Sequence, residues 1–193
     1  MAVVDSSLSL KEAESYYRKG LSPANDAIRA FLKDSPLIVY GARAINAHLP
    51  DWLDRETKDW DMLTPDNAEK QATTLEKKLD KRYGGDFFAV EPAVHEGTFR
   101  IRNRVTGEVV ADVTLKEKEV EFKRIKGINY ANLGYHEQHI LETLDDPQAS
   151  YRHWKDREAL QRIKIFKAAK AKRAKRKPRT SGEDEWGFMY GLG

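Results

Sequence analysis

The chain of 193 residues is 40% hydrophobic and 10% aromatic, a composition that indicates a folded protein with one core of moderate size. It contains no cysteine, which excludes a disulfide framework and thiolate zinc chemistry and favours a reducing, cytoplasmic compartment. The formal net charge is +3, and no apolar run approaches the roughly 20 residues that cross a bilayer, so we expect no membrane partner.

The N-terminal segment predicts two helices. The first is expected to run to about residue 19 behind a serine cap, and Gly20 ends it. The second is expected over 23–33, with Ser22 as its N-cap and Pro23 at its first position. Apolar residues recur at helical spacing in the second helix, so we expect residues 1–36 to brace the core.

A strand, a turn and a helix follow in direct succession. Residues 37–40 predict a short buried strand, Gly41 breaks it, and residues 42–49 have helical composition. Such a turn presents free backbone N–H groups and the positive end of a helix dipole, and glycine allows a ligand to approach closely. The unit therefore predicts a phosphate-binding turn.

Two aspartates occupy alternate positions of the next predicted strand. Residues two apart face the same side, roughly 6.5 to 7 Å between Cα atoms, so Asp59 and Asp61 point one way. Lys58, Trp60 and Met62 then point the other way. Converging carboxylates repel each other unless a cation lies between them, and hard oxygen ligands suit Mg²⁺ or Mn²⁺. The pattern predicts a divalent metal site.

The middle of the chain predicts one long helix and three strands. An amphipathic pattern covers 65–81, and the pattern then changes to period two over 87–90, 98–102 and 108–115. With the first two strands, these elements predict an α+β fold: a mixed sheet flanked by helices, followed by a helical basic C-terminal extension.

Asp112 is an acid among apolar neighbours in the last of these strands. Val110, Asp112 and Thr114 share one face of the strand by alternation. A buried and unpaired carboxylate is costly, so Asp112 needs a donor, a cation or solvent. Two interpretations stay open, a third carboxylate beside Asp59 and Asp61 or an ordinary salt bridge.

The C-terminal part is helical and basic. Residues 134–144 and 150–174 predict two helices that Pro147 separates. Residues 152–179 contain thirteen Lys or Arg against two acids, and such a run attracts RNA or DNA through counterion release, unless it is only a solvated helix end. The candidate nucleic-acid-binding residues are Lys170, Lys172, Arg173, Lys175, Arg176 and Lys177.

These motifs together resemble the nucleotidyltransferase superfamily, the fold of beta-type DNA polymerases and poly(A) polymerases. The resemblance covers residues 37–115, and it rests on Gly41 with its helix, on Asp59-x-Asp61 and on Asp112. The sequence around Gly41 and around Asp59 to Asp61 is closest to that of small viral or phage members of this superfamily. In that family a Gly-Ser or Gly-Gly pair begins the helix, whereas Ala42 stands second here.

The resemblance implies transfer of a nucleoside monophosphate from a nucleoside triphosphate, ATP for example, to an acceptor hydroxyl, with release of pyrophosphate. It implies that Asp59, Asp61 and Asp112 are catalytic and bind Mg²⁺ or Mn²⁺ in a two-metal mechanism. The implied nucleotide-binding residues are Gly41, Ala42, Arg43 and Lys155. The acceptor is expected to be a nucleic-acid 3′ end, while a protein or a small molecule stays open.

Two other functions stay open. Asp112 followed by Glu121 and Lys123 resembles the constellation of a Mg²⁺-dependent nuclease, although that motif leaves Asp59 and Asp61 unexplained. Ala42 favours a catalytically inactive nucleic-acid-binding protein.

We expect four parts in the chain. They are the bracing helices 1–36, a nucleotidyltransferase core 37–125, C-terminal helices 126–177 and a flexible tail 178–193. The tail combines an acidic patch with aromatic residues, so it is expected to dock on the domain or on a partner.

Overall fold

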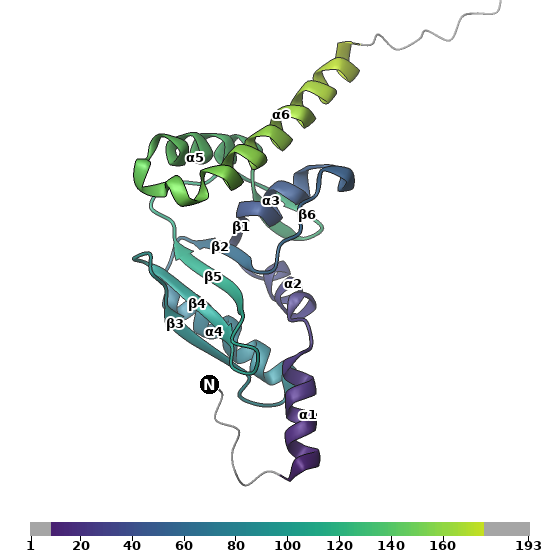
Figure 1. Ribbon diagram of the computed structural model, residues 1–193, viewed down its shortest axis with the longest axis vertical. Coiled ribbons are helices and arrows are strands. Elements are labelled where there is room, and N and C mark those ends of the chain that lie inside the picture. The colour runs from purple at the N-terminus through teal and green to yellow at the C-terminus, as the bar shows by residue number, and fades with distance from the viewer. Residues whose placement is uncertain (1–8, 176–193) are drawn as a thin grey trace, which may run out of the picture.

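The computed structural model describes residues 9–175 of the chain (Figure 1). The helices are α1 (Leu10–Gly20), α2 (Asn25–Lys33), α3 (Gly41–His48), α4 (Ala68–Tyr83), α5 (Leu133–Asp145) and α6 (His153–Lys175), with short 3₁₀ turns η1 (Asp51–Leu53) and η2 (Pro147–Arg152). The strands are β1 (Ile38–Tyr40), β2 (Trp60–Thr64), β3 (Phe88–Pro92), β4 (Thr98–Asn103), β5 (Val109–Leu115), β6 (Phe122–Ile125) and β7 (Ile128–Ala131).

All seven strands form one sheet in the order β3-β4-β5-β2-β1-β7-β6. The pairs β2–β5 and β1–β7 are parallel and the other pairs are antiparallel, so the sheet is mixed. The predicted α+β class with a mixed sheet flanked by helices is confirmed.

The main core lies between one face of the sheet and the helices α2 and α4, which lie together on one side of the sheet in Figure 1. Trp60 and Met62 of β2 are buried in this core beside Leu75 and Leu79 of α4. Each such side chain contributes about 1.5–3 kcal/mol when it is buried, which fixes the register of β2. Alternation then turns Asp61, between Trp60 and Met62, to the opposite face of the sheet.

A second cluster joins α3, α5 and α6 at the other end of the molecule. Its buried residues include Ile45 of α3, Ile140 of α5 and Ile163 of α6. Arg162 of α6 is buried and donates to the carbonyl oxygen of Leu53 and to the side chain of Asn46. These contacts attach the base of the long C-terminal helix to the helix that begins at Gly41.

Several expected boundaries need correction. Helix α1 has its predicted serine cap, Ser9, but α2 begins at Asn25 rather than Pro23 because Ser22 and Pro23 lie in the turn before it. Helix α4 begins at Ala68 rather than Pro65 because the Asn67 side chain caps it.

The hairpin of β6 and β7 was not expected. Strand β7 is fully buried and pairs with β1 in parallel, so it belongs to the same sheet as the carboxylate-bearing strands. We therefore propose a core that runs through Ala131 rather than ending at 125. No helix in the described range 9–175 is long and apolar enough to cross a membrane.

Candidate active site

Gly41 forms the turn between β1 and α3 in a conformation that favours glycine, with φ at +69°. A Cβ atom at this position would lie 2.5 Å from Oδ2 of Asp61, so a side chain has neither the backbone angle nor the space it needs. No side chain caps α3, which leaves its first N–H groups open beside that carboxylate. The expected phosphate-binding turn thus lies directly against Asp61.

Asp61 and Asp112 are register partners on the parallel strands β2 and β5. Neighbouring strands lie about 4.8 Å apart, so both carboxylates rise from adjacent positions on one face. Asp59 directly precedes β2. Burial raises the pKa of Asp61 to about 7, and the charges of Asp59 and Asp112 add to this effect. The charges of Asp59 and Asp112 therefore act on Asp61, although the carboxylate oxygens of the three do not all lie within 4.8 Å of one another.

Asp112 has a protein partner in this arrangement. Arg100 of β4 donates from Nε to Oδ1 and from Nη2 to Oδ2, each at 3.0 Å. The salt bridge foreseen as one interpretation is therefore present, and it coexists with the neighbouring carboxylate of Asp61. Arg100 was not predicted from the sequence as a residue of the site. Alternation in the predicted strand 98–102 places Thr98, Arg100 and Arg102 on one face, and this was the signal that could have found it.

Arg43 lies under the segment that carries Asp59. Its guanidinium lies 4.3 Å from the centre of the Trp60 ring and donates to Oδ1 of Asn25 at 3.1 Å. The same group donates to three consecutive carbonyl oxygens, those of Thr57, Lys58 and Asp59. Arg43 thus holds residues 57–59 in place, and a phosphate contact from it would compete with these bonds.

Tyr40 is a further residue of the site that the sequence did not single out. It is the register partner of Asp61 on the β1 side, and burial with the nearby charge of Asp61 raises its pKa to about 12. Its hydroxyl lies 3.5 Å from Oγ1 of Thr114. A neutral phenol therefore borders the carboxylates.

The turn η2, directly before α6, brings a cation toward the carboxylates. The charge of Arg152 acts against the rise in the pKa of Asp61, and its guanidinium forms an ion pair with buried Asp156 at 3.0 Å. Lys155 is exposed, with its Nζ 5.5 Å from the centre of the Trp154 ring. Arg152, at the end of η2, is thus a cation whose charge acts on Asp61.

The basic candidates lie far along α6, which projects away from the body of the protein in Figure 1. Lys170, Lys172 and Arg173 are exposed there. Lys175 ends the helix, while Arg176, Lys177 and the tail 178–193 lie outside the described residues.

The residues of the nuclease alternative are not brought together. Strands β2, β1 and β7 lie between β5, which carries Asp112, and β6, which carries Lys123. Glu121 accepts a hydrogen bond from the Asn132 side chain at 2.6 Å. The order of the strands therefore separates Asp112 from Glu121 and Lys123.

A second acidic cluster lies on α4, which packs on the opposite side of the sheet. Glu76, Asp80 and Asp86 have carboxylate oxygens within 4.8 Å of one another. Asp80 accepts from the backbone N–H groups of Phe87 and Phe88, and Asp86 forms an ion pair with Arg104. These bonds explain the cluster as a clamp on the start of β3.

No protein-family description matches the sequence, and comparison with curated proteins finds no relative. Among solved structures, the Megavirus polyadenylate synthase is similar to 82% of this chain at 17% identity, with a TM-score of 0.66. The chain spans 35% of that protein.

Two further structures align at lower scores. JHP933 from Helicobacter pylori matches 72% of this chain and 58% of its own length, at 17% identity and a TM-score of 0.37. An antigenic nucleotidyltransferase-like protein from Paracoccidioides brasiliensis matches 78% and 76%, at 13% identity and a TM-score of 0.44. These two similarities are too low to carry an argument, so the fold assignment rests on the Megavirus structure.

Over the matched 82% of its length the chain has the fold of the Megavirus polyadenylate synthase, and the family resemblance stated from the sequence is confirmed at the level of fold.

Proposed function

We propose that this protein is a metal-dependent nucleotidyltransferase that moves a nucleoside monophosphate from a nucleoside triphosphate to an acceptor hydroxyl. The observation that carries the proposal is the register of Asp61 with Asp112 beside the open turn at Gly41. An Asp61 carboxylate without a described hydrogen-bond partner, next to a helix N-terminus, suits a triphosphate that arrives with its cation.

The triphosphate is assigned to the N-terminus of α3. Backbone N–H groups at Gly41 and Ala42 would donate to its oxygens, and no acidic residue lies in the first turn of α3 to oppose them. Arg152 at the end of η2, with Lys155 of α6 as a further candidate, would supply positive charge. Arg43 would act indirectly, by holding the segment that ends at Asp59.

The carboxylate set fits Mg²⁺ or Mn²⁺. The described residues offer the Asp61 side chain no hydrogen-bond donor, and burial, together with the charges of Asp59 and Asp112, raises its pKa to about 7. Asp59, Asp61 and Asp112 would hold the metal. When bound, the metal supplies charge neutralisation for the phosphates and acidifies the acceptor hydroxyl.

Apart from charge neutralisation, the protein contributes to the reaction by positioning the acceptor hydroxyl and the triphosphate. The acceptor oxygen forms a bond to the α-phosphorus, the bond from that phosphorus to the bridging oxygen breaks, and pyrophosphate leaves. The proton of the acceptor hydroxyl passes to a carboxylate of the site or to solvent. Tyr40, held neutral by its raised pKa, borders the site as a hydrogen-bond donor and takes no part in proton transfer.

The acceptor we favour is the 3′ end of RNA or DNA. The exposed cations Lys170, Lys172 and Arg173 support this choice, with Lys175, Arg176 and Lys177 as the sequence continuation of the same run. A strand bound to the far part of α6 would keep its phosphates near the protein while its end reaches the carboxylates.

The test is incubation of the full chain with Mg²⁺ or Mn²⁺, each labelled nucleoside triphosphate in turn, and single-stranded RNA or DNA. We expect label to reach the strand with wild type and not with the double variant Asp59→Asn/Asp61→Asn. Glu76→Gln, which removes a carboxylate of the cluster on α4, should remain active. An active double variant, or no transfer from any triphosphate to any acceptor class, would overturn the proposal.

A further inference from the structure

Two large apolar side chains at the junction of η1 and α6 are exposed, and the reaction proposed above uses neither of them. Trp52 of η1 is 71% exposed and Ile165 of α6 is 41% exposed. Phe166, next to Ile165, is partly buried where it packs on the cluster of α3, α5 and α6. We call these three residues the η1–α6 patch. Burial of side chains of this size contributes up to about 1.5–3 kcal/mol each, so the patch is a candidate docking surface.

Two contacts show how η1 runs along α6. Nε of Arg55 lies 4.0 Å from a carboxylate oxygen of Glu158. One turn further along α6, Nε of Arg162 donates to the carbonyl oxygen of Leu53 at 2.6 Å. The two segments are therefore antiparallel, and Trp52 lies beside the following turn of α6, which carries the α6 part of the patch.

Beyond the patch, α6 continues as a row of cations and projects away from the body of the protein (Figure 1). Between residues 159 and 175 the helix contains no acidic residue. Its exposed cations are Lys164, Lys167, Lys170, Lys172 and Arg173. Lys167 pairs with Glu137 of α5, whereas the other four form no ion pair within the described range 9–175. Like charges along one helix repel one another, so an acidic segment beside them would be attracted.

The chain itself contains a segment of matching chemistry. Residues 180–193 contain three acids, at 183–185, and no Lys or Arg. Large apolar or aromatic side chains follow the acids directly: Trp186, Phe188, Met189 and Tyr190. A segment that returns antiparallel along α6 meets the cations first and the η1–α6 patch afterwards. The order of acids and aromatic residues therefore matches the order of the two surfaces.

The length of the connection permits this return. Ile165 lies ten residues before Lys175, which is about 15 Å along the helix. Trp186 lies eleven residues after Lys175, and an extended chain of that length spans at most about 36–40 Å. The excess allows a turn, and the connecting residues include the turn formers Pro178 and Gly182. Trp186 can therefore reach the patch of its own chain.

We propose that the segment 183–190 binds along α6 of the same chain, with Trp186 and Phe188 on the η1–α6 patch and the acids beside Lys170, Lys172 and Arg173. The docked segment occupies the cations that were assigned above to the phosphates of RNA or DNA, so it competes with nucleic acid and restrains the enzyme. This regulatory role rests on the proposed function, but the docking is measured without any transfer.

The experiment measures the affinity of the full chain for a fluorescent single-stranded RNA by anisotropy, without nucleoside triphosphate. Trp186→Ala/Phe188→Ala should raise the affinity at least fivefold, and Trp52→Ala should do the same. The combined variant should gain no more than either, because both changes break the same contact. None of these variants changes the charge of the chain. Trp154→Ala removes another exposed tryptophan of α6, about 16 Å farther from the segment along the helix, and should have no effect.

The other possible occupants of the patch give different results. A wild-type dimer that dissociates in Trp52→Ala, seen by sedimentation, would mean that the patch takes a second copy and would overturn the proposal. Affinities that do not change in Trp186→Ala/Phe188→Ala, as expected if the segment binds only a partner protein, would also overturn it. Additive gains in the combined variant, or no RNA binding by any variant, would do the same.

Transfer assays on the same proteins separate this inference from the proposed function. Unchanged RNA affinities in a protein that transfers nucleotide would refute the docking alone. The expected gains in RNA affinity, in a protein that transfers no nucleotide, would refute the proposed function and leave the docking standing.

Discussion

Arg100 of β4 neutralises Asp112 of β5 through two parallel hydrogen bonds, at the position where a metal ligand is proposed. Arginine and a divalent cation are competitors for the same carboxylate. The apparent metal affinity of the site therefore includes the free energy needed to loosen this pair.

Replacing Arg100 with glutamine should lower the Mg²⁺ concentration for half-maximal activity severalfold, because Asp112 no longer has a competing partner. The metal-free protein should lose about 1 kcal/mol of unfolding free energy, the usual value of a partly exposed ion pair. Magnesium titrations of activity and urea denaturation in EDTA measure the two effects. Arg102→Gln, which breaks the pair with Glu91 farther along β4, is the control, and an equal magnesium requirement in both variants would contradict the prediction.

The variant Asp61→Asn should be inactive yet more stable than wild type at alkaline pH without metal. The pKa of Asp61 is raised from 3.8 to about 7, so folding favours its protonated form. The folded wild type carries no penalty below about pH 4, loses stability as pH rises toward 7, and carries the full penalty above it. Three pKa units correspond to at most about 4 kcal/mol.

Thermal denaturation in EDTA at pH 5 and pH 8 tests whether ionisation of Asp61 destabilises the folded protein. The melting temperature of Asp61→Asn should exceed that of wild type at pH 8, and the gap should shrink at pH 5. Added Mg²⁺ should raise the melting temperature of wild type more at pH 8 than at pH 5. A variant that is less stable than wild type at pH 8 would show that the carboxylate is satisfied in the folded protein.

Gly41→Ala should abolish transfer, with a loss of at least 100-fold. The alanine would adopt a left-handed conformation, which costs roughly 1–2 kcal/mol, and its Cβ would displace the Asp61 carboxylate. Gly84→Ala is a matched control, because φ at Gly84 is +73° but no atom lies within 4 Å of the added Cβ. Both variants should lose similar backbone stability, while only Gly41→Ala loses activity; equal activities would mean that Asp61 has room to move.

Arg43→Lys should lower kcat about tenfold and leave triphosphate affinity nearly unchanged. Lysine keeps the charge but cannot donate in fixed directions to three carbonyl oxygens, so the position of Asp59 becomes less defined. Arg29→Lys is the control, since Arg29 also lies over the Trp60 ring, at 5.5 Å. A rise in the dissociation constant of the triphosphate at constant kcat would instead assign Arg43 to phosphate binding.

Changing Lys170, Lys172 and Arg173 together to glutamine should weaken binding of single-stranded RNA and make it less dependent on salt. Three lost phosphate contacts predict a reduction of about 2 in the slope of log affinity against log salt. Fluorescence anisotropy at several salt concentrations measures this slope. The same triple change at Lys70, Lys77 and Lys81 of α4 is a control of equal charge, and an equal loss there would mean that the effect is net charge alone.

The strands with strong alternation could be predicted from the sequence, and so could the glycine turn and the aspartates. The β6–β7 hairpin could not, because β6 is mostly charged and exposed, and because β7 is buried only through its distant pairing with β1. The partner of Asp112 also depends on a detail of register. Continuation of the pairing between Arg102 and Val109 would place Arg100 opposite Ala111, whereas the irregularity between Ile101 and Arg102 places it opposite Asp112.

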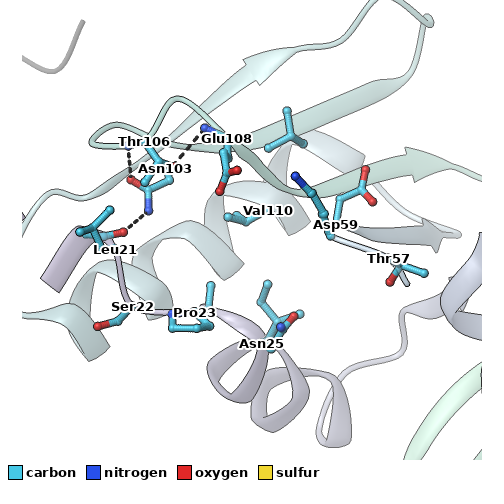
Figure 2. Close-up of a pocket in the computed structure, with 15 residues that line it drawn as sticks. Leu21, Ser22, Pro23, Asn25, Thr57, Asp59, Asn103, Thr106, Glu108 and Val110 are labelled. Carbon is cyan, nitrogen blue, oxygen red and sulfur yellow. Dashed lines mark hydrogen bonds between the residues drawn. The ribbon is translucent and has the colours of Figure 1, made fainter. Parts of the chain in front are cut away.

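Asn103 ties the turn between α1 and α2 to the β4–β5 hairpin with a single side chain (Figure 2). Its Nδ2 donates to the carbonyl oxygen of Gly20, and its Oδ1 accepts from the N–H groups of Val105 and Thr106. The space between the α1–α2 turn and the hairpin is therefore set during folding rather than by an arriving ligand. The amide hydrogens of Val105 and Thr106 should then exchange slowly in the free protein, without any added ligand.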